Sequence, residues 1–126
     1  MTKPKRILLV EDLPVIQRAV AHIMHKLDVE LTVAATGADA IKQFQQSKFD
    51  LIFMDIGLPD IQGDVVTQQI RDIEKQQGTH TPIVALTANL NQEDHPTYIE
   101  SGMEEVLLKP FSVQKAKTIF DKYIPA

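Results

Sequence analysis

The sequence contains no cysteine. This absence excludes a disulfide framework, a zinc site built from thiolates and a cysteine nucleophile. It also leaves no sign of an oxidising compartment. Any catalytic or binding chemistry must therefore come from oxygen and nitrogen side chains.

Long hydrophobic runs are also missing. No apolar run approaches the roughly 20 residues that a membrane-spanning helix needs. The N-terminal segment MTKPKRILLVED places basic residues before an apolar stretch, but that stretch is only four residues long and ends in two acids. It does not have the form of a signal peptide. We therefore predict a cytoplasmic domain that makes no membrane contact.

The chain lacks an excess of basic residues, with 13 Lys and Arg against 17 Asp and Glu and a net charge of −4. Contacts to nucleic-acid phosphates need clustered Lys and Arg, so this balance argues against direct nucleic-acid binding. Aromatic residues make up 6% of the chain, and its five phenylalanines are scattered. We expect them to pack in the core rather than to stack on bases. The length of 126 residues indicates one domain, residues 1–126.

Five short apolar runs recur along the chain. Three of them are nearly continuous and rich in β-branched residues, which is typical of strands buried on both faces of a parallel sheet. The runs, and the strands that we predict from them, are RILLVE (6–11), ELTVAA (30–35), DLIFMD (50–55), PIVALT (82–87) and EEVLLK (104–109).

Segments with helical periodicity separate these runs. From Pro14 to Leu27 the apolar residues repeat at i, i+3, i+4 and i+7, which indicates one buried helix face. Shorter stripes follow around residues 40–44 and 65–73, and another begins after Ser112, which we predict to be an N-cap. The segment between Asn91 and Ser101 has the least clear pattern. Alternating strands and helices predict one α/β domain with a parallel sheet and helices on both faces.

Polar residues stand at the carboxyl ends of four of the five predicted strands. In open α/β sheets, ligands bind outside the carboxyl ends of the strands, where the strand order reverses. If the first, third, fourth and fifth strands are neighbours, their terminal side chains meet at one edge of the sheet. These side chains are Glu11, Asp12, Asp55, Thr87 and Lys109.

The chemistry of this set indicates a phosphoryl site. Three carboxylates at one edge repel one another, and a divalent cation removes that cost. Ligands that are all oxygens suit Mg²⁺. Lys109 and Thr87 would supply a positive charge and a hydroxyl donor to a phosphoryl group. Asp55 is the candidate nucleophile, since a carboxylate can itself form an aspartyl phosphate.

The chain resembles the receiver (response-regulator) domain of two-component signalling. The resemblance extends from Arg6 to about Tyr123 and rests on four motifs in order: ILLVED, MDIGLPDIQG, ALTA and LLKPF. It implies a domain core of residues 6–123 and a single doubly wound, flavodoxin-like parallel sheet of five strands. The implied strand order is 2-1-3-4-5, with five helices.

The resemblance implies a role for each residue of the acidic edge. Asp55 would accept a phosphoryl group from a phosphohistidine. Asp12 would bind Mg²⁺ directly, and Glu11 would do so directly or through water. The backbone carbonyl of Gly57 would complete the protein ligands of the metal, with Asp55 itself.

The remaining motif residues would contact the phosphoryl group. Thr87 would turn toward it, Ala88 would leave room for it and Lys109 would pair with it. Many receivers carry Tyr or Phe three residues before the lysine, where this chain has Val106. Valine has no ring to rotate with Thr87, which favours a phosphoryl relay over an output switch.

The motifs most resemble receivers of hybrid histidine kinases. The implied partner is a histidine kinase or a histidine phosphotransfer domain, and the implied state is a monomer or weak dimer. Such a domain is not itself an enzyme, although it assists its own phosphorylation and dephosphorylation. The parent kinase would be the enzyme and could be anchored in a membrane. The alternative is a stand-alone response regulator.

Three other functions compete with this interpretation. A phosphohydrolase of the haloacid-dehalogenase type also uses an aspartyl phosphate, but it resembles D-x-D at the nucleophile, where this chain has Gly57. A flavodoxin-like cofactor binder needs a phosphate-binding first loop, and the acidic EDLP segment would repel a phosphate. A scaffold that is never phosphorylated would not need the complete set of motif residues.

Four local predictions follow. Residues 13–16 include an exposed apolar contact for a partner's helix, with Pro14 in the first helical turn. Asp60 is a turn residue rather than a ligand. Pro96 shortens the fourth helix, so that it starts near His95 and stops at Gly102. The family resemblance implies a cis peptide between Lys109 and Pro110.

Overall fold

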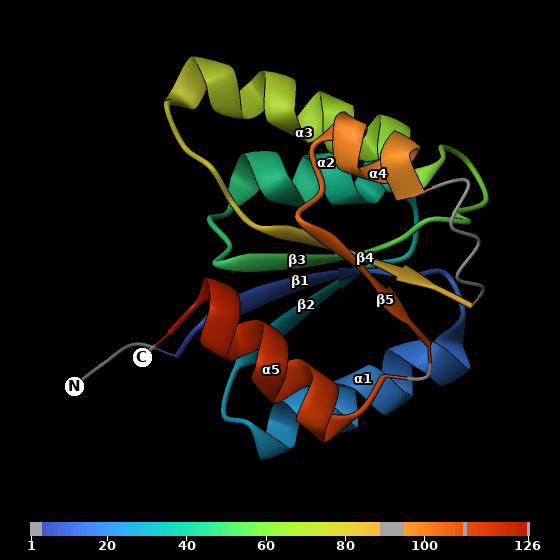
Figure 1. Cartoon of the computed structure of the whole chain (residues 1–126), viewed down its shortest axis with the longest axis vertical. Coiled ribbons are helices and arrows are strands. Elements are labelled where there is room, and N and C mark those ends of the chain that lie inside the picture. Colours follow the sequence, from blue (N-terminus) through green and yellow to red (C-terminus); the bar gives the residue numbers. More distant parts are fainter. Residues whose placement is uncertain (1–3, 89–94, 110, 126) are drawn as a thin grey trace.

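The computed structural model describes residues 4–88, 95–109 and 111–125. Within these ranges, five strands and five helices alternate (Figure 1). They are β1 (Arg6–Val10), α1 (Pro14–Lys26), β2 (Glu30–Ala34), α2 (Gly37–Gln46), β3 (Leu51–Asp55), α3 (Gly63–Gln77), β4 (Ile83–Thr87), α4 (His95–Ser101), β5 (Glu105–Leu108) and α5 (Val113–Tyr123).

The strands form one parallel sheet in the order β2-β1-β3-β4-β5. Helices α2, α3 and α4 cover one face of the sheet, and α1 and α5 cover the other (Figure 1). The predicted fold class, strand order and number of helices are confirmed. Each predicted strand extends at most one residue further at either end than the observed one.

The core lies in two layers because alternate residues of the strands point to opposite faces of the sheet. Residues of β3 are all buried, which agrees with its continuous apolar sequence. The layer under α2 and α3 includes Leu8, Ile52, Met54, Ile83, Val66 and Ile70. The layer under α1 and α5 includes Leu9, Leu51, Phe53, Leu86, Ile23 and Ile119.

The helix ends follow the predicted signals. Pro14 lies in the first turn of α1, and the Ser112 side chain caps α5 by accepting a hydrogen bond of 3.1 Å from the Lys115 amide. Helix α4 ends at Ser101, and Gly102 follows with φ of +117°. The predicted stop at Gly102 is confirmed.

Two predictions concern residues outside the described part of the chain. They are the cis peptide at Pro110 and the path by which residues 91–94 lead into α4. Both stay predictions. Among the described residues, no helix is long and apolar enough to span a membrane.

Candidate functional site

The carboxyl ends of β1 and β3 bring three carboxylates together. One ligand oxygen from each of Glu11, Asp12 and Asp55 lies within 4.8 Å of the other two. Glu11 is fully buried, Asp55 is 7% exposed and Asp12 is half-buried. The register aligns Val10 with Met54, so the residues that follow these two strand positions meet at one edge. The grouping predicted from the sequence is therefore what the structure contains.

Lys109 supplies the positive charge next to these acids. Its Nζ lies 2.8 Å from Glu11 Oε1 and 3.4 Å from Asp55 Oδ1. Burial raises the pKa of the Glu11 carboxyl, as does the charge of Asp55, while the hydrogen bond from Lys109 partly offsets the rise. Burial alone would lower the pKa of Lys109, but the hydrogen bond to Glu11 and the nearby carboxylates raise it above its ordinary value. The ammonium group therefore stays charged.

The loop after β3 closes tightly around the end of that strand. The Gly57 amide donates a hydrogen bond of 3.2 Å to Asp55 Oδ1, and the Gly63 amide donates one of 3.0 Å to the Ile56 carbonyl. Gly57 is exposed at the rim of the site. The backbone of Gly57, whose carbonyl is a predicted metal ligand, therefore lies close to Asp55, which is another predicted ligand.

Thr87 and Ala88 lie on the neighbouring strand end. The register pairs Asp55 with Leu86 and Thr87 with Leu108, so Thr87 lies at the same edge of the sheet as the acids. The Thr87 carbonyl accepts a hydrogen bond of 2.7 Å from the Lys109 amide. Ala88 is exposed beside this strand end. The structure therefore places both residues at the end of β4 on the same edge of the sheet as the acids.

Val106 is half-buried and packs against the core layer under α2 and α3. It lies on the edge strand β5 and pairs with Ala85 of the neighbouring strand β4. The side chain that replaces the family's aromatic residue is thus a packing residue of the sheet.

The arrangement can hold a divalent metal ion. Mg²⁺ prefers oxygen ligands and usually keeps several waters, so a few carboxylates at an open rim suit it. A metal ion would also offset the repulsion between three acids, two of which are buried. The donor set therefore fits the cation predicted from the sequence.

An apolar groove borders the acidic edge between α1 and the segment after β5. Its lining includes Val15, Ile16, Ala19, Leu86, Lys109 and Phe111. Val15 is 76% exposed and Leu13 is 50% exposed. Exposed apolar side chains therefore continue from the groove onto the surface of α1, where the sequence predicted a partner contact.

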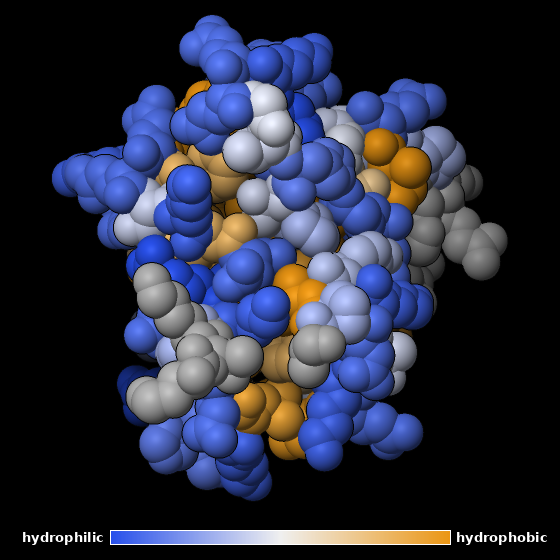
Figure 2. Space-filling view, turned by 90° about the vertical axis from the view of Figure 1, so that its left-hand side faces the viewer, coloured by the Kyte–Doolittle hydropathy of each residue, from blue (hydrophilic) through white to orange (hydrophobic). Residues whose placement is uncertain are grey.

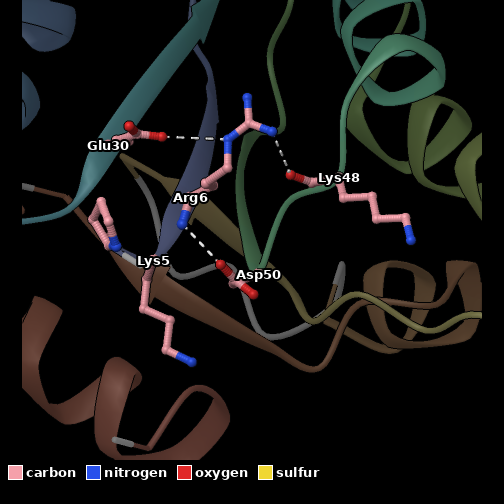
Figure 3. Close-up of a pocket in the computed structure, with 6 residues that line it drawn as sticks. Lys5, Arg6, Glu30, Lys48 and Asp50 are labelled. Atoms are coloured by element: carbon pink, nitrogen blue, oxygen red, sulfur yellow. Dashed lines mark hydrogen bonds and ion pairs between the residues drawn. The ribbon is translucent and has the colours of Figure 1, made fainter. Parts of the chain in front are cut away.

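The opposite end of the sheet, where the strands begin, has a mainly hydrophilic surface. Figure 2 views the molecule from the end where the strands begin, and its surface there is mainly hydrophilic with small, separate apolar patches. Arg6 lies in a shallow pocket at this end, with Glu30, Lys48 and Asp50 around it (Figure 3). It contacts Glu30 at 3.4 Å, the Lys48 carbonyl at 3.2 Å and, through its amide, Asp50 at 2.8 Å. These contacts engage the arginine within the chain.

Sequence reasoning missed one residue near the site. Asp60 was predicted to be a turn residue, and it does lie in the loop after β3. Its carboxylate also accepts hydrogen bonds from the Gly37 amide, at 2.8 Å, and the Ala38 amide, at 3.1 Å. The aspartate is thus an N-terminal cap of α2, a helix that begins 23 residues earlier. No local sequence signal links two segments so far apart.

Comparisons with known proteins agree with this geometry. The sequence model of the family described as response regulator receiver domain matches residues 7–121. Transcription factor SKN7 of Chaetomium thermophilum is 36% identical over 97% of this chain. Hybrid signal transduction histidine kinase I of Dictyostelium discoideum is 32% identical over 86% of it. The chain spans 16% of the first and 7% of the second protein.

Two solved structures are similar throughout. One is the receiver domain of Saccharomyces cerevisiae Ssk1 in a co-crystal with the histidine phosphotransfer protein Ypd1. It has a TM-score of 0.88 and 30% identity, covering 98% of this chain and 91% of that one. The other is the receiver domain of Pseudomonas aeruginosa sensor histidine kinase PA1611, with a magnesium ion in its active-site cleft. It has a TM-score of 0.87 and 34% identity, covering 98% and 100%.

Proposed function

This chain belongs to the response regulator receiver domain family, and we propose that its Asp55 accepts a phosphoryl group from a phosphohistidine of a partner protein. One observation carries the proposal. Asp55 lies in a cluster with Glu11 and Asp12, whose ligand oxygens are within 4.8 Å of one another, while the Lys109 ammonium is 3.4 Å from Asp55. A nucleophilic carboxylate, a place for a cation and a fixed positive charge thus meet at one point.

The proposed reaction is a direct transfer. An Asp55 carboxylate oxygen attacks the phosphorus atom, and a P–O bond forms as the P–N bond to the imidazole breaks. The imidazole nitrogen keeps the electron pair of the broken bond and takes a proton from water. Charge on the three equatorial oxygens grows during the transfer, and Lys109 neutralises part of it. The Thr87 hydroxyl then donates a hydrogen bond to the phosphoryl group, beside Ala88.

We assign the metal site to Glu11, Asp12, Asp55 and the carbonyl of Gly57, with Mg²⁺ as the cation. When bound, Mg²⁺ stabilises the negative charge of the phosphoryl oxygens. Since the Pseudomonas receiver binds magnesium in its active-site cleft, the same cation is the natural choice for this donor set. The domain assists chemistry on its own side chain and does not turn over a separate substrate.

The partner that we propose is a histidine phosphotransfer domain or a histidine kinase. The Ssk1 receiver is crystallised with such a phosphotransfer protein. Here the apolar groove of Val15, Ile16 and Phe111 lies next to Lys109, so a partner helix seated on it would have its phosphohistidine near Asp55. Burying the exposed Val15 side chain would contribute about 1 to 2 kcal/mol to binding.

We also propose what kind of larger protein contains this receiver. Relatives of this chain include both transcription factors and hybrid histidine kinases, and the sequence motifs favour the kinases. We propose a cytoplasmic receiver, monomeric or weakly dimeric, attached to a hybrid kinase. The reading frame on both sides of the chain tests this context.

Phosphorylation by a small-molecule phosphoryl donor with Mg²⁺ tests the central proposal. Intact-mass measurement should show one added phosphoryl group on the wild-type chain and none on Asp55→Asn or after chelation of the metal. Asp50→Asn is the matched control, because Asp50 precedes the same strand at its other end. Unchanged phosphorylation of Asp55→Asn, or none of the wild type, contradicts the proposal.

The docking surface has a separate test. Val15→Glu should slow transfer from a phosphorylated histidine phosphotransfer protein while leaving the small-molecule reaction unchanged. Ala21→Glu, on an exposed part of the same helix outside the groove, is the control. Equal transfer rates for the two variants would reject this surface.

A further inference from the structure

The loop between β3 and α3 is tied to a second helix by Asp60. The Asp60 carboxylate accepts hydrogen bonds from the amides of Gly37, at 2.8 Å, and Ala38, at 3.1 Å. Both amides belong to the first turn of α2, where backbone N–H groups have no partner within the helix. These hydrogen bonds, from Gly37 above all, lower the pKa of Asp60. The carboxylate thus caps a helix to which it is not adjacent in sequence.

The contact between loop and helix is close. A Cβ atom on Gly37 would lie 2.7 Å from Val66 Cγ2 and 3.1 Å from Ile61 Cβ. A side chain at Gly37 would therefore force Val66 of α3 or Ile61 of the loop to shift. Figure 1 shows α2 and α3 side by side on one face of the sheet. Asp60 thus sits at a junction of three segments.

The same loop carries a proposed metal ligand. Gly57 lies three residues before Asp60, and its amide bonds to Asp55 Oδ1. At its base the loop is closed by the hydrogen bond between Gly63 and Ile56, and Leu58 is held in the core. Gly57 itself is exposed. The Asp60 tether therefore restrains the exposed part of the loop against a rigid helix.

We propose that Asp60 is a positioning residue for the metal site, holding the loop so that the Gly57 carbonyl is ready to bind the cation. This inference rests on the proposed function, in which Gly57 is a ligand. Mg²⁺ demands near-ideal octahedral geometry. If the loop must become ordered when the cation binds, the conformational entropy lost in that step weakens the affinity. A tethered loop has already been ordered during folding, so binding does not carry this cost. Loss of the tether should therefore weaken Mg²⁺ binding by roughly fivefold, the effect of fixing about one residue.

A matched pair of variants separates this role from simple capping of α2. Asp60→Ala removes the tether, while Thr36→Ala removes the local cap of the same helix, in which Thr36 Oγ1 accepts a hydrogen bond of 3.1 Å from the Asp39 amide. Both variants lose a helix cap, and only the first releases the loop. Asp60→Asn keeps one acceptor oxygen and should fall between wild type and Asp60→Ala.

Mg²⁺ titrations followed by NMR shifts of the Gly57 amide measure the affinity of each variant. We expect roughly fivefold weaker binding for Asp60→Ala and unchanged binding for Thr36→Ala. Amide hydrogen exchange in metal-free protein is a second readout. Exchange should accelerate across residues 57–62 in Asp60→Ala alone.

Each other result overturns the inference. If Asp60→Ala binds Mg²⁺ as wild type does, the tether does not position the ligand. If both variants weaken binding equally, the effect belongs to α2 stability. If the wild-type chain binds no Mg²⁺, the proposed function is wrong, and so is this inference, which rests on it. This result is distinct from the first two, in which the wild type does bind Mg²⁺.

Discussion

Lys109 lies nearer to Glu11 than to Asp55, with Nζ at 2.8 Å from the first carboxylate and 3.4 Å from the second. The ammonium group thus bridges two acids that come from neighbouring strands. Glu11 is fully buried, so this pair compensates a charge that water does not reach. A cation entering the cluster must share these carboxylates with the lysine. Lys109 and the metal ion are therefore competitors as well as partners.

Replacing Lys109 should have opposite effects on metal binding and on phosphorylation. Lys109→Met removes a positive charge beside the cation site, and two unit charges about 4 Å apart interact by several kcal/mol at the effective dielectric of protein surfaces. With screening by solvent, we expect roughly tenfold tighter Mg²⁺ binding. Phosphorylation should slow, because the phosphoryl oxygens lose a neutralising partner.

Lys122→Met is the control for this prediction. Lys122 is on α5, and its Nζ lies 3.1 Å from the Glu105 carboxylate of β5. Its side chain is half exposed, and it lies outside the acidic cluster. In a calorimetric titration, the Mg²⁺ affinity of Lys122→Met should equal that of the wild type. Weaker or unchanged Mg²⁺ binding by Lys109→Met would show that the lysine does not compete with the metal.

The two glycines of the loop after β3 should differ in their tolerance of alanine. A Cβ on Gly57 would meet no atom within 4 Å, whereas a Cβ on Gly63 would lie 2.5 Å from the Asp55 carbonyl oxygen. Gly57→Ala should therefore keep stability within about 0.5 kcal/mol and keep phosphorylation, since its proposed ligand is a backbone atom. Gly63→Ala must move the Asp55 backbone and should cost about 1 to 3 kcal/mol.

Urea unfolding and phosphorylation by a small-molecule donor measure both effects. The two variants carry the same chemical change, so each is the control for the other. Equal stability of Gly57→Ala and Gly63→Ala would contradict the close approach of α3 to the end of β3.

The fold could be predicted because its signals are local. Strand β3 is an unbroken apolar run, α1 has a regular apolar stripe, and Ser112 and Gly102 mark helix ends by their own chemistry. The acids and Lys109 could be predicted as a group because each lies at the carboxyl end of a strand or within two residues of it. Parallel strands then bring them to one edge whatever the details of packing.

Contacts between distant segments could not be predicted. Asp60 reads as a turn residue in LPDIQG, and its bond to Gly37 depends on how α2 packs against the loop. The partly buried Arg71 is similar, since it joins α3 to the segments before β4 and β5. Such bonds form only once the tertiary structure has brought both partners together, and nothing in either local sequence specifies them.

Arg71 should be a strong determinant of stability. It donates hydrogen bonds to the carbonyls of Thr81, at 2.8 Å, and Gly102, at 2.7 Å, and forms ion pairs with Glu74 and Glu104. Arg71→Met leaves the buried Glu74 without its cation, which typically costs about 3 to 5 kcal/mol. Urea unfolding measures the loss.

Arg18→Met is the matched control, because Arg18 is exposed on α1 and should change stability by less than about 0.5 kcal/mol. The Arg71 contacts lie where β4 and β5 begin, away from Asp55. Folded Arg71→Met should therefore still be phosphorylated. A loss below about 1 kcal/mol would show that this network contributes little.

Tyr123 provides a test of the structure at high pH. Its hydroxyl donates a hydrogen bond of 2.5 Å to Glu105 Oε2. Burial, this hydrogen bond and the charge of Glu105 raise the pKa of the phenol from 10.0 to about 12. Absorbance of tyrosinate in Tyr98→Phe, where Tyr123 is the remaining tyrosine, should therefore titrate near pH 12 in the folded chain and near pH 10 once urea unfolds it.

The same shift predicts how stability depends on pH. Since the folded pKa is raised, the neutral phenol's contribution is fully present below pH 10 and is lost as the pH rises toward about 12. Tyr123→Phe should cost about 1 kcal/mol at neutral pH, the net value of a typical hydrogen bond. That difference from wild type should shrink between pH 10 and 12, because in this window the phenol of the unfolded chain ionises while that of the folded chain stays mostly neutral. Stability curves of the two chains that stay parallel across this window would contradict the Tyr123–Glu105 contact.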